Sequence, residues 1–253
     1  MLRFGVKHGG SAMSTTLNLV DSLLQQSQKL HNLGRTGDAH RLLLRLAGLR
    51  KLPPQTAETS QALLAEIYLK RRQYRRARRS LTAALAHQDS SAKYHYLLAQ
   101  SWHEDQKGDN EQARDHYARS LELDPNQPDC MSRLGLVEVE LGEVEQGLEH
   151  LRRAVEVAPH DPAVLRRQVE GLRLADRADE VRSAILAARF RNPRDARFQK
   201  VWNDFQFEEL RRHQEKGLDF DDDAAANGPV LLPFLSEAHQ DDGRQPPPFR
   251  KIG

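Results

Sequence analysis

The stretch MSRLGLVEVELGEVEQGLEHLRRAVEVAP, residues 131–159, contains the pattern that decides the fold. Its apolar residues recur three and four positions apart on both sides of Gly142, as in amphipathic helices. Gly142 suits a helix-ending backbone conformation that side chains with a β-carbon disfavour. Pro159 ends the second helix, because proline has no N–H and restricts the residue before it. The stretch therefore predicts a helical hairpin.

Large and small side chains alternate along this hairpin in a way that predicts its packing. Leu134 and Leu151 fall on facing helices, where they serve as core residues. Gly135, Gly147 and Ala154 are small, and small residues let two helix backbones approach closely. We expect larger residues at these three positions to push the helices apart.

The same positions recur along the chain with a period of 34 residues. They are Pro125, Pro159 and Pro193 at helix ends, Gly108, Gly142 and Asp176 at turns, and Ala113, Gly147 and Val181 in second helices. Fixed periods of this length are typical of stacked helix hairpins. Weaker repeats of the pattern begin near residue 17, so we expect about five hairpins over residues 17–193.

Two further motifs support the repeat. One is Leu64-Ala65-x2-Tyr68 followed by Ala77-x3-Leu81-x2-Ala84, and the other is Leu98-Ala99-x2-Trp102 followed by Ala113-x3-Tyr117-x2-Ser120. Together with residues 131–159, they resemble the tetratricopeptide repeat family. The resemblance implies an all-α fold, a right-handed superhelical solenoid of helical hairpins, with residues 194–217 as a C-terminal capping helix. The first and fifth units depart from the pattern, as terminal repeats do.

The two ends of the chain differ from the repeats in composition. Residues 1–16 are expected to be a disordered arm, or to follow from a start codon assigned too far upstream. Residues 218–253 are rich in Pro, Asp and Gly and predict a flexible tail. This tail carries seven acidic and three basic residues, a net charge of −4, which leaves +6 on the rest of the chain. The N-terminus lacks the apolar stretch of a signal peptide, so a cytoplasmic location is expected.

Composition and motifs argue against several classes of protein. No apolar run is long enough to span a membrane, and the one cysteine, Cys130, cannot form an intramolecular disulfide or a thiolate zinc cluster. The sequence contains no glycine-rich phosphate loop, no GxSxG motif, no HExxH motif and no paired CxxC. We therefore expect a protein that is not an enzyme and needs no cofactor.

His95, His103 and His116, with Glu104, Asp105, Asp109 and Glu111 nearby, are candidate metal ligands, because imidazole and carboxylate groups bind metals. His95 and His103 lie eight residues apart on one predicted helix, about 12 Å along its axis, which is too far to chelate a single ion. Solvated histidines or histidines lining a groove are the favoured interpretation of His95, His103 and His116, so no metal site is predicted. Cys130 is expected to be a small apolar core residue.

The predicted function is protein–protein interaction through a groove, as a binding module or assembly adaptor. The resemblance implies that first helices of successive hairpins line a concave groove that accepts a peptide or protein segment. The expected lining residues are Glu66, Leu69, Lys70, Tyr96, Gln100, His103, Ser132, Arg133, Leu136, Val139, Arg166, Arg167, Glu170 and Arg173. Leu136 and Val139 suggest an apolar anchor site flanked by cations, which fits a hydrophobic residue beside carboxylates. The alternative is that these are ordinary packing residues and surface arginines.

Two more specific partners are considered for this groove. Some family members hold the terminal carboxylate of heat-shock chaperones in a Lys/Asn/Arg clamp. The matching positions here are Ala62, Glu66, Leu97, Asp129 and Arg133, and only Arg133 agrees, which argues against that partner. The acidic tail is a second candidate. Flexible residues of this number reach about 30–36 Å, so residues 219–223 and 230–235 are predicted to contact the arginine-rich part of the groove.

A basic run, Lys70-Arg71-Arg72-Gln73-Tyr74-Arg75-Arg76-Ala77-Arg78-Arg79, crosses one predicted turn. Its arginines after Tyr74 are expected on the outward flanks of the second helix, as a solvated surface. The alternative function is a nucleic-acid-associated or ribosome-associated factor that binds through this run, with Tyr74 stacking on a base. Nucleic acid is the less favoured partner.

Overall fold

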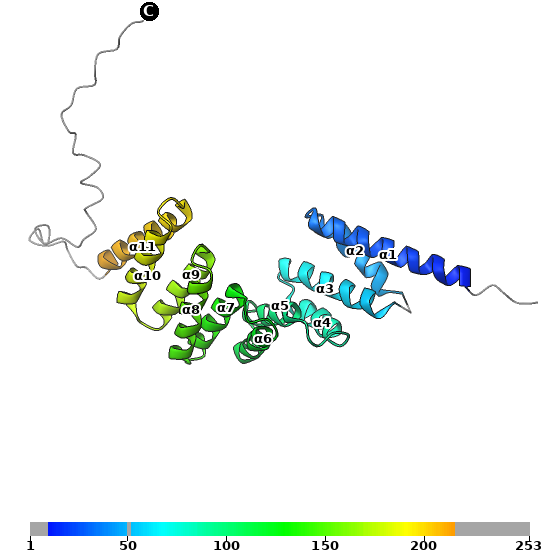
Figure 1. The fold of residues 1–253 in the computed structure, drawn as a ribbon, viewed down its shortest axis with the longest axis horizontal. Coiled ribbons are helices and arrows are strands. Elements are labelled where there is room, and N and C mark those ends of the chain that lie inside the picture. The colour runs from blue at the N-terminus through cyan, green and yellow to red at the C-terminus, as the bar shows by residue number, and fades with distance from the viewer. Residues whose placement is uncertain (1–9, 50–51, 216–253) are drawn as a thin grey trace, which may run out of the picture. The chain divides into compact units, whose positions relative to one another are not determined.

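The computed structural model describes residues 10–49 and 52–215, and over these ranges the chain forms eleven α-helices and no strand (Figure 1). The helices are α1 (Gly10–Asn32), α2 (Thr36–Ala47), α3 (Pro54–Lys70), α4 (Tyr74–Leu85), α5 (Ala92–His103), α6 (Asn110–Leu123), α7 (Pro128–Glu140), α8 (Val144–Val157), α9 (Pro162–Leu174), α10 (Ala178–Arg191) and α11 (Ala196–Glu215). The predicted all-α fold of helical hairpins is therefore confirmed.

Helices α1 to α10 form five consecutive hairpins, and each second helix also packs on the first helix of the following hairpin. The chain divides into two compact units between Val201 and Trp202, so α11 begins in one unit and ends in the other. Within the second unit, the rings of Trp202 and Phe205 lie 5.7 Å apart.

Turns within four of the five hairpins share one backbone feature. A residue with positive φ stands two positions before the second helix: Gly34, Arg72, Gly142 and Asp176. This left-handed conformation is disfavoured by a β-carbon, but Asp tolerates it better than most residues. Asp176 thus takes the place that Gly142 has in the preceding hairpin. The third hairpin has two extra residues before Gly108, which has no positive φ.

Glycines bring α7 and α8 into backbone contact, as the sequence predicts. A β-carbon added to Gly135 would lie 2.5 Å from the carbonyl oxygen of Gly147, and one added to Gly147 would lie 2.5 Å from that of Gly135. Leu134 and Leu151 are both buried beside this contact. Alanines take the equivalent places in the two preceding hairpins, Ala65 and Ala77 in the second and Ala99 and Ala113 in the third, and all four are fully buried.

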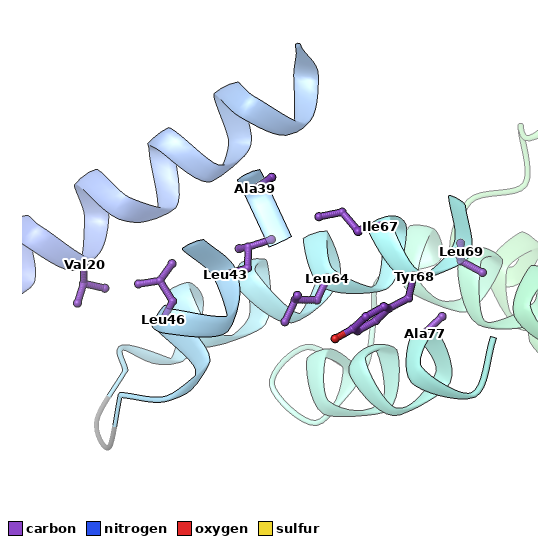
Figure 2. Close-up of a cluster of buried hydrophobic side chains, with 9 residues drawn as sticks. All are labelled: Val20, Ala39, Leu43, Leu46, Leu64, Ile67, Tyr68, Leu69 and Ala77. Carbon is purple, nitrogen blue, oxygen red and sulfur yellow. The ribbon is translucent and has the colours of Figure 1, made fainter. Parts of the chain in front are cut away.

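Apolar clusters are distributed along the hairpins. Figure 2 shows the cluster formed by the first two hairpins, with Tyr68 of α3 lying toward Ala77 of α4. A second cluster joins α5, α6 and α7 around Tyr117, whose side chain is fully buried. Each of these two clusters therefore spans two consecutive hairpins, as expected for a solenoid.

The ends of the chain differ in part from the expectation. Helix α1 begins at Gly10, so residues 10–16 are helical although the sequence analysis assigns them to a disordered arm. Residues 1–9 and the acidic tail from residue 218 lie outside the described residues. None of the described helices is both long and apolar enough to cross a membrane.

Candidate interaction surface

Polar side chains connect the first helices of the third, fourth and fifth hairpins. The hydroxyl of Tyr96 on α5 donates a hydrogen bond to Oδ2 of Asp129 on α7. Arg167 on α9 reaches the same carboxylate, with its Nη1 2.8 Å from Oδ1, and donates to the hydroxyl of Ser132 over 2.9 Å. Side chains of three successive first helices therefore meet at Asp129.

Arg133 belongs to the same network. Its Nε lies 3.2 Å from Oδ2 of Asp129, one helical turn earlier, and its Nη1 lies 3.4 Å from Oε1 of Glu104. Its guanidinium carbon is 5.8 Å from the ring centre of Tyr96. The side chain is 18% exposed, so Arg133 remains partly accessible.

Electrostatics within this network favour the charged form of Asp129. Burial by itself would raise the pKa of this carboxyl, but the hydrogen bond from Tyr96 and the charges of Arg167 and Arg133 outweigh it and lower the pKa below its usual range. Burial raises the pKa of Tyr96, so its hydroxyl stays protonated as a donor. The site thus holds a carboxylate among two guanidiniums and a phenol.

We expect the network to make stability depend on pH. An acid whose pKa is lower in the folded state stabilises the fold above its unfolded pKa, near 3.8, and this contribution is lost as pH falls through the folded value. Between pH 5 and 3 the urea midpoint of the wild type should therefore fall more steeply than that of Asp129→Asn. Parallel midpoint curves for the two proteins would contradict this assignment.

Most of the predicted groove residues are accessible. Lys70, Arg166 and Glu170 are exposed, while Glu66, Tyr96, Gln100, His103, Arg133, Arg167 and Arg173 are half-buried. Arg166 has no acidic partner among the described side chains. We define the first-helix face as the accessible residues on α5, α7 and α9: Tyr96, Gln100, His103, Arg133, Arg166, Arg167, Glu170 and Arg173.

Two other predicted groove residues, Glu66 and His103, already contact oppositely charged or ionisable side chains. Glu66 lies 3.0 Å from Nε2 of His31 and 2.7 Å from Nζ of Lys93. His103 lies 3.2 Å from Oε2 of Glu140, which links α5 to α7 a second time. The contacts hold these side chains in place but leave Lys70 exposed at the end of α3.

For four of the predicted lining residues the prediction is wrong, because they are buried and not on the surface. Leu69, Ser132, Leu136 and Val139 are each at most 9% exposed. Helix α7 packs against α6, α8 and α9, so most of its circumference is covered. Val139 shows this directly, because its Cγ2 lies 2.7 Å from a β-carbon placed on Gly147 of α8. The apolar anchor site predicted at Leu136 and Val139 is therefore part of the core.

The histidine cluster separates into unrelated contacts. Nδ1 of His95 lies 3.2 Å from Nδ1 of His116, with the rings stacked, whereas His103 faces Tyr117 and Glu140. Over residues 10–49 and 52–215, no three His, Cys, Asp or Glu side chains are placed to hold a metal ion. Cys130 is buried, as predicted, and burial raises its pKa to about 12, which keeps it a thiol.

The basic run differs from its predicted arrangement at one residue. Arg78 points inward: it donates to the backbone oxygen of Ser101 over 2.6 Å and to Oδ2 of Asp105 over 2.8 Å, and its guanidinium lies 4.0 Å from the ring centre of Trp102. It therefore fastens the second hairpin to the third. The prediction that Arg78 lies on an outward flank is wrong.

A cleft of about 310 Å³ lies between α8, α9 and α10. Leu148 and Leu172 contribute apolar surface, and the ion pair between Arg177 and Glu145, 2.7 Å long, borders it. The cleft contains none of the predicted groove residues. Its wall therefore defines a surface separate from the first-helix face.

Sequence reasoning missed the carboxylates that organise the first-helix face. The spacing of Asp129 and Arg133, four residues apart on one helix, signals their pairing. No comparable signal in the sequence identifies the contact of Glu104 with Arg133 or the contact of Arg167 with Ser132. Each contact joins residues about 30 positions apart or more.

Comparison with known protein families gives matches to the middle part of the chain. Two family models, both described as tetratricopeptide repeat, match residues 62–128 and residues 106–169. A search of curated proteins gives no match to this sequence.

Solved structures with a similar fold are numerous. A MamA protein aligns with a TM-score of 0.59 and 19% identity, covering 70% of this chain and 93% of its own. YrrB, described as a TPR protein with an unusual peptide-binding site, has a TM-score of 0.59 and 13% identity, covering 77% and 98%. A thermophilic TPR protein in Thermus thermophilus, TTC0263, has a TM-score of 0.54 and 21% identity, covering 73% and 97%. Identities this low show a shared fold only.

Proposed function

Residues 62–169 belong to the tetratricopeptide repeat family, and on this basis we propose that the protein is an interaction module or assembly adaptor without catalytic activity, which binds an acidic protein segment on its first-helix face. The general role in protein–protein interaction follows from the repeats. The location of the site and the acidic character of its ligand are our inference from the side chains.

The contact of Tyr96, Asp129 and Arg167 carries the proposal. In it, side chains from three successive first helices meet on one surface, which is long enough to follow an extended chain. Helix repeats of this kind use such surfaces for recognition. The hydrogen-bonding groups are also held in defined positions, which lowers the entropy cost of binding.

Charge on this surface favours a ligand with carboxylates. Arg133 and Arg167 share Asp129, and Arg133 also contacts Glu104, while Arg166 lies exposed without an acidic partner in the described chain. Guanidinium groups bind carboxylates through two parallel hydrogen bonds. A carboxylate of the ligand would therefore pair with Arg166 and compete with Asp129 for the partly accessible Arg133. YrrB, which shares the fold, is described as having a peptide-binding site, and this is consistent with such a ligand.

We expect Arg166→Glu to weaken binding of acidic peptides at least tenfold. A charge-assisted hydrogen bond contributes about 1.5–3 kcal/mol, and the substitution also adds repulsion. The assay uses immobilised 15-residue peptides of acidic, neutral and basic composition. Arg153→Glu is the matched control, because Arg153 is an exposed arginine on the second helix α8 with the same charge change.

Preference of the wild type for acidic peptides, with loss in Arg166→Glu only, supports the proposed site. Equal binding of the three peptide classes, or equal loss in both variants, contradicts it.

We further propose that residues 218–253, with their net charge of −4, compete for this face. In the same assay a chain ending at residue 217 should bind acidic peptides more tightly than the full chain, and unchanged affinity would rule the competition out.

A further inference from the structure

Six exposed cations surround the turn of the second hairpin. We name them the basic patch: Lys70, Arg71, Arg72, Arg75, Arg76 and Arg79. Arg78, the seventh cation of the run, is not part of it, because its guanidinium is committed to Ser101, Asp105 and Trp102. The structure thus separates one arginine that stabilises packing from six that face solvent.

The basic patch is not neutralised by the protein itself. None of its six side chains forms an ion pair with an acidic residue within the described part of the chain. Arg76 donates a hydrogen bond to Gln73, and its guanidinium carbon lies 5.9 Å from the ring centre of Tyr68. Elsewhere on the surface, arginines such as Arg114 and Arg152 each contact two carboxylates. Like charges this dense repel one another, and an anionic ligand would relieve the repulsion.

The direction of helix α4 adds to the positive potential. The helix begins at Tyr74 with no side-chain cap on its N–H groups and no acidic residue in its first turn. The N-terminal end of a helix carries partial positive charge, where Arg75 and Arg76 are unfavourable without a counterion.

The basic patch lies beside the preceding hairpin. Nη2 of Arg71 lies 4.0 Å from a β-carbon placed on Gly37, at the start of α2. Nε2 of His40 on α2 lies 3.2 Å from the hydroxyl of Tyr68. Burial lowers the pKa of His40 most, and the charges of Arg71 and Arg76 lower it further, so the imidazole stays neutral. Arg71 and Arg76 of the basic patch therefore lie close enough to α2 to affect His40.

We propose that the basic patch binds the phosphate backbone of nucleic acid without reading the bases. Five of its six cations are arginines, whose planar guanidiniums bind phosphate through paired hydrogen bonds. Arg75 and Arg79 lie one helical turn apart, about 6 Å along α4, so they can contact separate phosphates. A nucleic-acid strand presents such charges at regular, close intervals.

Features around the basic patch argue against other ligands and against base recognition. Tyr74 packs against the apolar cluster of the first two hairpins, so it is not available as a stacking platform for a base. The predicted stacking by Tyr74 is therefore not part of this proposal. The run also has no exposed apolar side chain to insert into a lipid surface, as a membrane-binding helix requires.

Fluorescence anisotropy on the full chain tests the proposal, with labelled 20-nucleotide RNA and 20-base-pair DNA, each in two unrelated sequences. We expect binding at 50 mM KCl that does not depend on sequence and weakens at 200 mM. For single strands, about four phosphate contacts give a slope of about −3 in a plot of log K against log salt concentration. Absence of binding at 50 mM overturns the proposal.

The decisive comparison uses two triple variants with the same change in net charge. Arg71→Gln, Arg75→Gln and Arg79→Gln together should weaken binding at least tenfold and make the salt slope shallower by about 2. Arg153→Gln, Arg191→Gln and Arg194→Gln replace three exposed arginines outside the basic patch, and affinity should change less than about twofold. Circular dichroism establishes that both variants keep their helices.

Equal losses in the two triple variants would mean that net charge alone attracts nucleic acid, and the assigned site would be wrong. Vesicles containing phosphatidylserine and a poly-glutamate peptide serve as competitors. If the protein binds either of them more tightly than nucleic acid, and this binding is lost in the triple variant of Arg71, Arg75 and Arg79 but kept in Arg166→Glu, the basic patch belongs to that class of ligand and the proposal is overturned.

Discussion

Replacement of Gly147 by valine should destabilise the protein by about 3 kcal/mol. A β-carbon at this position would lie 2.5 Å from the carbonyl oxygen of Gly135 and 2.9 Å from the backbone nitrogen of Val139. Both atoms belong to the backbone of α7, so a rotamer change cannot relieve the overlap and the two helices must separate. Overpacking of a core costs about 1–3 kcal/mol, and contact with backbone places this site at the upper end. Urea denaturation measures the free energy of unfolding.

Gly48→Ala is the matched control for this prediction. Gly48 has a φ of −79°, and a β-carbon there would meet its nearest neighbours at 3.5 and 3.6 Å, which are ordinary contacts. We expect alanine at this position to change stability by less than about 1 kcal/mol, in the stabilising direction. Similar stability of Gly147→Val and Gly48→Ala would show that close contact of α7 and α8 is not needed.

Substitution of His150 by leucine should cost about 3 kcal/mol through its effect on Glu138. The carboxylate of Glu138 is only 1% exposed and accepts hydrogen bonds from Nδ1 of His150 over 2.6 Å and from the amide of Gln146 over 3.0 Å. Loss of the imidazole leaves a buried carboxylate with one neutral donor, and removal of one partner from a buried pair costs about 3–5 kcal/mol. Because Gln146 remains, we expect the lower end of this range.

Replacement of Glu138 together with His150 tests whether the unpaired carboxylate of Glu138 causes the loss of stability. The double variant Glu138→Leu and His150→Leu leaves no unpaired polar group, so it should recover most of the stability lost by His150→Leu. A double-mutant cycle measured by urea denaturation gives the coupling energy. Equal cost of His150→Leu with and without Glu138 would contradict the buried pair.

Local signals explain why most of the fold can be predicted from the sequence. Gly142 and Pro159 act on their own neighbours in the chain, and each specifies a turn or a helix end without any tertiary contact. The close contact of Gly135 and Gly147 joins residues twelve positions apart within one hairpin, and the 34-residue repeat carries this geometry to the neighbouring hairpins.

The candidate site was less predictable, because it depends on how neighbouring hairpins meet. Leu136 and Val139 interrupt a polar face in sequence, but both are buried, because α7 packs against α6, α8 and α9. Arg78 has the same sequence surroundings as Arg75 and Arg79, and only its distance from Asp105 and Trp102 distinguishes it. Contacts between residues more than about 20 positions apart leave no periodic pattern in the sequence.

Site-specific photocrosslinking tests the proposed function most directly. A benzoylphenylalanine replaces Glu170, an exposed residue of α9 one turn from Arg166, or in a second protein Arg153 of α8. Each protein is irradiated with the acidic 15-residue peptide that binds the wild type most tightly. The proposal predicts a crosslinked peptide at position 170 and none at position 153. Crosslinking at position 153 with none at position 170 would contradict binding on the first-helix face.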